Sequence, residues 1–251
     1  MKILKTRAEW LREKQSLGAC TVGLVPTMGA LHGGHASLVR RSVAENDVTV
    51  VTVFVNPTQC NNPRDLATYP VSFAEDCALL ERAGASYVFA PDYGTMYPDG
   101  YRYRVNETDF SKTLCGVTRP GHFEGVLTVV LKQLNVFRPD RAYFGEKDYQ
   151  QYLLIRDMAE ALFLETEIVP CPLVREETGL ALSSRNRRLS PQGLATAPLL
   201  YRALSSGKEA DEIRAELEDH GFSVDYLEER FGRLFAAVFL EDVRLIDNVA
   251  R

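Results

Sequence analysis

Hydrophobic positions in the first two thirds of the chain fall into two kinds of pattern. Short runs rich in β-branched residues, such as 48–55 (VTVVTVFV), lack polar alternation and are typical of strands buried on both faces. Runs with apolar residues three or four positions apart predict amphipathic helices. We therefore predict strands at 21–26, 48–55, 86–90 and 141–144, and helices at 5–17, 34–46, 75–83, 125–137 and 148–162.

These strands and helices alternate, which predicts an α/β fold with a parallel sheet and right-handed crossovers. The pattern changes near 169–174, and no further strand–helix unit follows Asn186. Residues 192–239 are rich in charge and predict helices, and a short apolar run, VRLID, follows at 243–247. We expect a first domain at 1–172 and a smaller one at 173–251.

Composition narrows the classes of function. The 251 residues are 45% hydrophobic and 25% charged, which is ordinary for a globular enzyme, and a net charge of −5 disfavours nucleic acid as a partner. The five cysteines are scattered without a C-x-x-C pair, which argues against structural zinc and favours a reducing, cytoplasmic location. The polar N-terminal segment and the lack of a long apolar run predict neither a signal peptide nor a membrane span.

The segment 26–35 (PTMGALHGGH) is the strongest candidate for chemistry. A strand enters a glycine-containing turn, and a helix begins at about His35, so backbone N–H groups and the positive helix end should point at one spot. His32 and His35 add ring donors beside that spot. This pattern favours a phosphate site over the alternatives, a surface turn with incidental histidines or a metal pair without an obvious third ligand.

A second candidate, 145–148 (GEKD), follows a predicted strand at the sheet edge where α/β folds place ligands. Lys147 is suited to neutralise a phosphate. Asp148 is suited either to accept from a ribose hydroxyl or simply to cap the next helix. Gln151, in the first turn of that helix, is expected to face the same crevice.

Three further segments are ambiguous when taken singly. The run 182–186 (LSSRN) suits a polyphosphate, although a polar linker explains it as well. Asn56 and Gln59 end a predicted strand and suit hydroxyl, carboxylate or amine groups, but turn chemistry around a proline is an equal alternative. A glycine-rich loop carries His122, for which we favour a structural role, and His220 is predicted to lie on the surface.

Together these segments resemble the pantothenate synthetase (pantoate–β-alanine ligase) family. The matching pieces occur in the family's order and are VPTMGALHGGH (25–35), FVNPTQ (54–59), LCG-x-x-RPGHFEGV (114–126), PDRAYFGEKDYQQ (139–151) and GLALSSRN (179–186). The resemblance implies a Rossmann-like nucleotidyltransferase domain of the HIGH type and a small C-terminal lid domain, shortened here after Pro191. It also implies a cytoplasmic homodimer in the coenzyme A pathway.

The reaction implied by the resemblance has two steps. The carboxylate of (R)-pantoate attacks the α-phosphate of ATP, which forms pantoyl adenylate and releases pyrophosphate. The amine of β-alanine then attacks the activated carbonyl, which gives pantothenate and AMP. Mg²⁺ accompanies the ATP. Catalysis of such phosphoryl chemistry rests mostly on alignment and on stabilising charge.

The resemblance also implies roles for individual residues. It makes His35 a proton donor and assigns catalytic contacts to His32, Lys147, Ser183, Ser184 and Arg185. The rest of the ATP site would be Met28, Gly29, Ala30, Leu31, Gly33, Gly34, Gly145, Glu146, Asp148, Val174 and Leu182. Gln59, Gln151 and Asn56 would bind substrate, with Gln59 also beside β-alanine, and Glu75 and Asp76 would approach Mg²⁺.

Three positions depart from the family's pattern. Cys60 stands where the family usually has Phe, Arg64 where it usually has Glu, and Gly33 where a polar residue is common. Loss of a phenyl ring from a pocket wall is expected to weaken packing or substrate contact at the pantoate site. Two alternatives to the ligase are another nucleotidyltransferase, such as an aminoacyl-tRNA-synthetase-like activator, and a nucleotide-binding regulator without catalysis.

Overall fold

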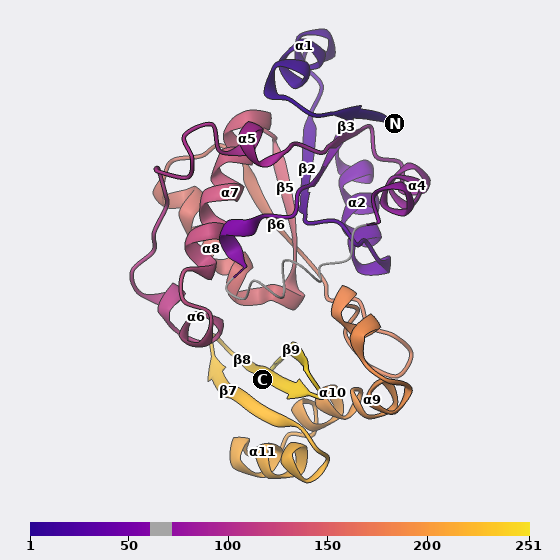
Figure 1. Ribbon diagram of the computed structural model, residues 1–251, viewed down its shortest axis with the longest axis vertical. Coiled ribbons are helices and arrows are strands. Elements are labelled where there is room, and N and C mark those ends of the chain that lie inside the picture. Colours follow the sequence, from indigo (N-terminus) through magenta and orange to yellow (C-terminus); the bar gives the residue numbers. More distant parts are fainter. Residues whose placement is uncertain (61–71) are drawn as a thin grey trace.

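The computed structural model describes residues 1–60 and 72–251, which form an upper parallel-sheet region and a lower antiparallel-sheet region in Figure 1. The strands are β1 (Lys2–Leu4), β2 (Val22–Thr27), β3 (Val48–Val53), β4 (Tyr87–Phe89), β5 (Arg141–Gly145), β6 (Glu167–Cys171), β7 (Ser223–Arg230), β8 (Arg233–Leu240) and β9 (Val243–Ala250). The α-helices within the described residues are α1 (Arg7–Leu17), α2 (Gly33–Glu45), α4 (Phe73–Ala83), α5 (Tyr93–Met96), α6 (Cys115–Thr118), α7 (His122–Phe137), α8 (Tyr149–Ala161), α9 (Pro191–Thr196), α10 (Leu199–Leu204) and α11 (Ala210–Asp219). The predicted strands and helices of the first region are confirmed, and β1 and β6 are additions.

The parallel sheet has the order β1-β4-β3-β2-β5-β6. The chain therefore winds outward from β2 in both directions, and the strand order reverses between β2 and β5. An open α/β sheet binds its ligands at such a reversal, beyond the carboxyl ends of the strands. Pairing of β2 with β5 is confined to Gly23 and Leu24, and Pro26 further along β2 has no N–H to donate. The two strands thus separate toward their carboxyl ends.

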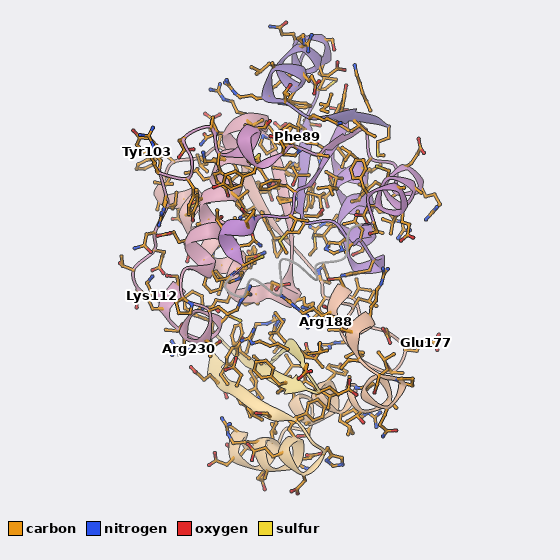
Figure 2. All side chains as sticks on the ribbon, viewed as in Figure 1. Phe89, Tyr103, Lys112, Glu177, Arg188 and Arg230 are labelled. Carbon is orange, nitrogen blue, oxygen red and sulfur yellow. The ribbon has the colours of Figure 1, made fainter. Side chains whose placement is uncertain are left out.

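The two faces of the sheet bury different residues because successive side chains of a strand point to opposite sides. Leu24 and Val50 join the apolar cluster that contains α7 and α8, whereas Val25 and Val51 join the cluster that contains α2 and α4. Figure 1 shows these helix pairs on opposite sides of the sheet. Full burial of one such side chain contributes about 1.5–3 kcal/mol, so both helix layers are firmly attached. In Figure 2 the buried Phe89 of β4 lies within this region.

The C-terminal region is an antiparallel sheet in the order β7-β8-β9, with α10 and α11 packed on it. The prediction of helix through 192–239 is wrong beyond Asp219, where β7 and β8 follow α11. Half of the residues in SVDYLEER favour helix, but Phe231 and Gly232 both have positive φ, at 51° and 67°, and make a hairpin turn. β8 is buried over most of its length as the central strand. Tertiary burial here outweighs local propensity.

The apolar side chains of this region form a cluster that runs from Leu180 to Leu245, separate from the two clusters of the parallel sheet. Tyr226 and Ile246 bridge the two regions by packing against the larger sheet cluster. The separation agrees with two packed units, and the boundary near residue 173 stays a prediction. Among the described residues, no helix has both the length and the apolar character that crossing a membrane requires.

Candidate functional site

A cavity of about 250 Å³ lies where the strand order reverses, at the carboxyl ends of β2 and β5. Most of the residues predicted from the sequence line it, namely Met28, His32, Gly34, His35, Asn56, Gln59, Gly145, Lys147, Asp148, Gln151, Val174, Leu182, Ser183, Ser184 and Arg185. The others do not line it, namely Gly29, Ala30, Leu31, Gly33, Glu75, Asp76 and Glu146. Four segments far apart in the sequence thus converge on one cavity.

The two histidines are fixed by the start of α2. His32 is the N-cap, where its Nδ1 accepts the N–H of Gly34 at 3.2 Å, and its own N–H donates to Nδ1 of His35 at 3.3 Å. Burial, reinforced by Lys147, lowers the pKa of His32 to about 4. Burial, reinforced by the His32 ring, lowers the pKa of His35 to about 3. Both rings are therefore neutral at pH 7, and because each Nδ1 accepts, each proton lies on Nε2.

Asp76 of α4 accepts hydrogen bonds from the backbone of the turn that precedes α2. The Asp76 carboxylate is buried and accepts the N–H groups of Ala30 at 2.9 Å and Leu31 at 2.8 Å. Ser72 donates its hydroxyl to the same carboxylate at 3.1 Å. The expected convergence of the turn's N–H groups on a ligand is thus wrong for Ala30 and Leu31, because a carboxylate of the protein already accepts them. Their contact with ATP stays a prediction.

The residues predicted to approach Mg²⁺ do not fit a metal site in this arrangement. Both oxygens of Asp76 accept hydrogen bonds from the protein, and Glu75 is exposed outside the cavity. Within residues 1–60 and 72–251, no cluster of three His, Cys, Asp or Glu could hold a metal ion. We therefore derive no chemical step from a metal bound by these residues.

Lys147 lies in a short 3-10 helix, Glu146–Asp148, between β5 and α8. Its Nζ is 3.8 Å from the carboxylate of Asp148. The amide of Asn248, in β9, donates to the carbonyl oxygens of Glu146 at 2.9 Å and Lys147 at 3.1 Å. The backbone of this loop is thus held by the C-terminal region rather than by the parallel sheet alone.

Asp148 occupies the N-cap position of α8, but its side chain makes no cap hydrogen bond. The simple helix-cap interpretation is therefore wrong. Burial would raise the pKa of Asp148, but the cations Lys147 and Arg185 outweigh it and lower the pKa. A negative carboxylate thus faces the cavity, where it suits acceptance from hydroxyl groups rather than contact with phosphates.

The segment after β6 folds back over the cavity. Leu182 donates its N–H to the carbonyl of Val174 at 3.0 Å, and Arg175 forms a two-armed ion pair with buried Asp247 of β9 at 2.6 and 2.8 Å. Ser183 accepts the N–H of Arg185 at 3.2 Å and starts the 3-10 helix Ser184–Arg188. The hydroxyls and guanidinium of this segment are thereby brought to the cavity that the histidines also line.

The amides of Asn56 and Gln59 form one unit. Asn56 is 1% exposed and donates to Oε1 of Gln59 at 2.9 Å, while its own oxygen accepts from the hydroxyl of Tyr97 at 2.8 Å. Asn56 therefore orients Gln59 at the cavity wall. Gly125 lets α7 pack closely against the backbone of this unit, since a Cβ at Gly125 would lie 2.4 Å from the carbonyl oxygen of Thr58. Cys60 also lines the cavity, and Arg64 lies outside the described residues.

The sequence interpretation placed His122 in a loop and gave it a structural role, but it is the first residue of α7 and lines the cavity. Its Nδ1 lies 2.8 Å from the carbonyl oxygen of Gln59, and its Nε2 lies 3.0 Å from Nη1 of Arg119. Burial, followed by the Arg119 charge, lowers the pKa of His122 to about 3. The sequence signal was its position shortly before the long apolar helix that the sequence predicts at 125–137.

The inner wall of the cavity is mainly apolar. It is formed by Pro26, Phe54, Val126, Val129, Val130 and Phe144. Gln133 of α7 also lines it, and its buried amide oxygen has no hydrogen-bond partner among the described residues. An apolar wall with a few amides suits a small branched acid with hydroxyl groups.

A parallel sheet with a reversal of strand order, and neutral imidazoles and a lysine in one cavity at that reversal, are the features of a Rossmann-like nucleotide-binding enzyme. The family model described as pantoate-beta-alanine ligase matches residues 2–250. The chain therefore belongs to the pantoate-beta-alanine ligase family, which confirms the resemblance found in the sequence.

Individual relatives agree. A protein named pantothenate synthetase from Bdellovibrio bacteriovorus is 50% identical over 250 residues, which cover 99% of this chain and 98% of that protein. One from Legionella pneumophila is 48% identical over 249 residues, with 99% of both covered. A solved structure of pantoate-beta-alanine ligase from Francisella tularensis, complexed with beta-gamma ATP and beta-alanine, is 38% identical with a TM-score of 0.93, covering 100% of this chain and 97% of that one.

Proposed function

We propose that this chain condenses (R)-pantoate with β-alanine at the expense of ATP, which is cleaved to AMP and pyrophosphate. The observation that carries the proposal is the convergence of the histidine pair, the Lys147 loop, the Ser183–Arg185 segment and the Asn56–Gln59 unit on one cavity. The membership of the family and the ligands named for the Francisella structure support the same substrates.

In the first step, a carboxylate oxygen of pantoate attacks the α-phosphorus of ATP, and the bond to the bridging oxygen of pyrophosphate breaks. Negative charge moves to the leaving pyrophosphate. We infer that Lys147, Arg185 and the Nε2–H groups of His32 and His35 stabilise that charge from opposite sides. Ser183 and Ser184 would add hydroxyl donors to the same phosphates.

The histidines serve this step as hydrogen-bond donors in our proposal. A ring with a pKa of about 3 or 4 is neutral at pH 7, and its one proton lies on Nε2 because Nδ1 accepts a backbone N–H. His35 would therefore donate a hydrogen bond from Nε2 at pH 7 and would not transfer that proton, because a neutral imidazole is a very weak acid. This interpretation refines the proton-donor role that the resemblance implies.

In the second step, the neutral amine of β-alanine attacks the acyl carbonyl of pantoyl adenylate. An amide bond forms, AMP leaves with the electron pair of the acyl–oxygen bond, and the amine loses a proton. We propose that Gln59 and Gln151 orient pantoate through both steps, with the apolar wall against its methyl groups. Asn56 would act by holding Gln59.

The remaining expectations from the sequence also stay proposals. They are Mg²⁺ carried with the phosphates of ATP, a homodimer, a cytoplasmic location, and the division into domains 1–172 and 173–251. Asp148 would accept from a ribose hydroxyl, in agreement with its charge, and the backbone of Met28–Leu31 would border the nucleotide.

A single assay tests the proposed function. Purified protein is incubated with ATP, Mg²⁺, pantoate and β-alanine, and AMP, ADP, pyrophosphate and pantothenate are measured. We expect AMP and pantothenate in equal amounts, no turnover without either substrate, and pantoate-dependent exchange of labelled pyrophosphate into ATP when β-alanine is absent. Formation of ADP would reject an acyl adenylate, and ATP binding without AMP would indicate a regulator.

A further inference from the structure

The guanidinium of Arg119 lies in the cavity wall without a carboxylate partner among the described residues. Its two contacts are Nη1 with Nε2 of His122 at 3.0 Å and Nη2 with the carbonyl oxygen of Gln59 at 3.3 Å. Arg244, on the same side, differs because Asp225 accepts from it at 2.7 and 2.9 Å. Partly buried arginines are normally paired, so the charge of Arg119 calls for a bound anion that no described residue of the chain supplies through an ion pair.

The contacts of Arg119 fix its plane and leave donors free. Because His122 accepts from Arg119 at Nε2, its proton lies on Nδ1, which donates to Gln59 at 2.8 Å. Two of the five guanidinium N–H groups are occupied in this way, and three remain. A planar guanidinium that is oriented by two hydrogen bonds is well suited to bind a carboxylate through its remaining N–H groups.

The position of Arg119 distinguishes the possible anions. It lies between the main cavity and a smaller one beneath the C-terminal sheet, since it lines both together with His122 and Lys147. The ATP phosphates in the proposed reaction have their own donors at the start of α2 and on Lys147. The carboxylate of pantoate is the nucleophile, and it loses its charge on forming the adenylate, so a lasting ion pair would oppose the first step.

The carboxylate of β-alanine, in contrast, keeps its charge throughout the reaction. Arg119 also contacts the backbone of Gln59, whose side chain we place beside pantoate. A molecule anchored at Arg119 would therefore present its other end toward the acyl group. We propose that Arg119 binds the carboxylate of the amine substrate, and that His122 positions the guanidinium for it. The inference rests on the proposed function and adds a specificity determinant to its second step.

The test compares two amines and separates the two steps. Arg119→Gln and Arg119→Lys are assayed with β-alanine and with its uncharged amide, 3-aminopropanamide. The control variant is Arg12→Gln, an exposed arginine of α1. For Arg119→Gln we expect kcat/KM for β-alanine to fall by about 100-fold or more, as for other lost charge-paired contacts. The amide should react as slowly with the variant as with the unaltered enzyme, because it makes no use of the charge.

Pantoate-dependent exchange of pyrophosphate into ATP reports the first step alone. It should stay within about threefold of the unaltered enzyme in both Arg119 variants. Arg119→Lys keeps the positive charge but not the planar pair of donors, so its kcat/KM for β-alanine should fall by less than that of Arg119→Gln. If Arg119→Gln folds poorly, the Lys variant still tests the proposal.

Three outcomes would overturn the proposal. A parallel loss of exchange would assign Arg119 to ATP or pantoate. Equal losses with both amines would assign it a structural role. Unchanged kinetics with β-alanine would remove it from the site. Absence of exchange in the unaltered enzyme is a different result, since it would refute the proposed function itself.

Discussion

The two walls of the cavity are held in different ways. The wall at the start of α2 is built from contacts within the parallel-sheet region, where the histidines cap their own helix and Asp76 anchors the turn. The opposite wall, around Lys147, has its backbone held by Asn248 from the C-terminal sheet. The comparison teaches that the phosphate donors on one side need only a folded first region, whereas those on the other side also need the C-terminal region docked.

The largest effect on catalysis is expected from removing Lys147, the positive charge of the second wall. Lys147→Ala should lower the rate of pantoate-dependent pyrophosphate exchange by at least about 100-fold, or some 2.7 kcal/mol, because the leaving phosphates would lose the ammonium group that we propose to neutralise them. Lys5→Ala, at an exposed position, is the matched control. An unchanged exchange rate would remove Lys147 from the catalytic set.

The support of that wall is tested by Asn248→Ala. The variant leaves two carbonyl oxygens without their donor, and we expect exchange about 10-fold slower and stability about 1–3 kcal/mol lower. Leu245→Ala, which truncates a buried side chain of the same strand, should lower stability without slowing the exchange measured on folded protein. Equal slowing in both variants would show that docking alone, and not the grip on Lys147, determines the rate.

The support of the first region is tested at Gly125. A Cβ there would lie 2.4 Å from the carbonyl oxygen of Thr58, so Gly125→Ala must move the Asn56–Gln59 unit away from α7. We expect a loss of about 1–3 kcal/mol in stability and a higher KM for pantoate. Gly94→Ala in α5 would place its Cβ in ordinary contact, 3.7 Å from Asp92, and should be neutral. Comparable kinetics in both variants would contradict the close approach of α7 to this unit.

Measured per pH unit, the smallest expected effect is a dependence of stability on pH. Because the pKa of His122 is lowered to about 3 in the folded protein, the unfolded chain binds more protons below about pH 6.5. The unfolding free energy should therefore fall as pH decreases from about 6.5 toward 4, by up to about 1.4 kcal/mol per pH unit for each such histidine. Denaturant titrations at several pH values should show that the unfolding free energy of His122→Asn depends less steeply on pH than that of the unaltered protein.

Local patterns in the sequence predicted most of the parallel sheet, because a strand such as β3 is β-branched throughout and its own residues are enough to predict it. They failed in the C-terminal region, where the strand character of β7 depends on pairing with β8 and its own residues favour helix. Strands β1 and β6 were missed for a related reason, since β1 is three residues long and both depend on a neighbouring strand.

The residues that line the candidate site were largely predicted, but the connections among them were not. The contacts of Asn248 with Lys147 and of Arg119 with Gln59 join residues 101 and 60 positions apart. The pattern of residues within one segment cannot predict contacts at such a separation. The role of Asp76 illustrates the same limit, since an acidic residue early in a helix gives no indication that its partners are N–H groups of a distant turn.

The pair of rings that caps α2 also offers a spectroscopic handle. Each imidazole is held in one tautomer by a backbone hydrogen bond to its Nδ1, so its two nitrogens are chemically distinct before any ligand arrives. Nitrogen NMR of labelled histidine can therefore follow occupancy of the pocket directly, through the resonance of the outward nitrogen, without altering a single residue of the chain.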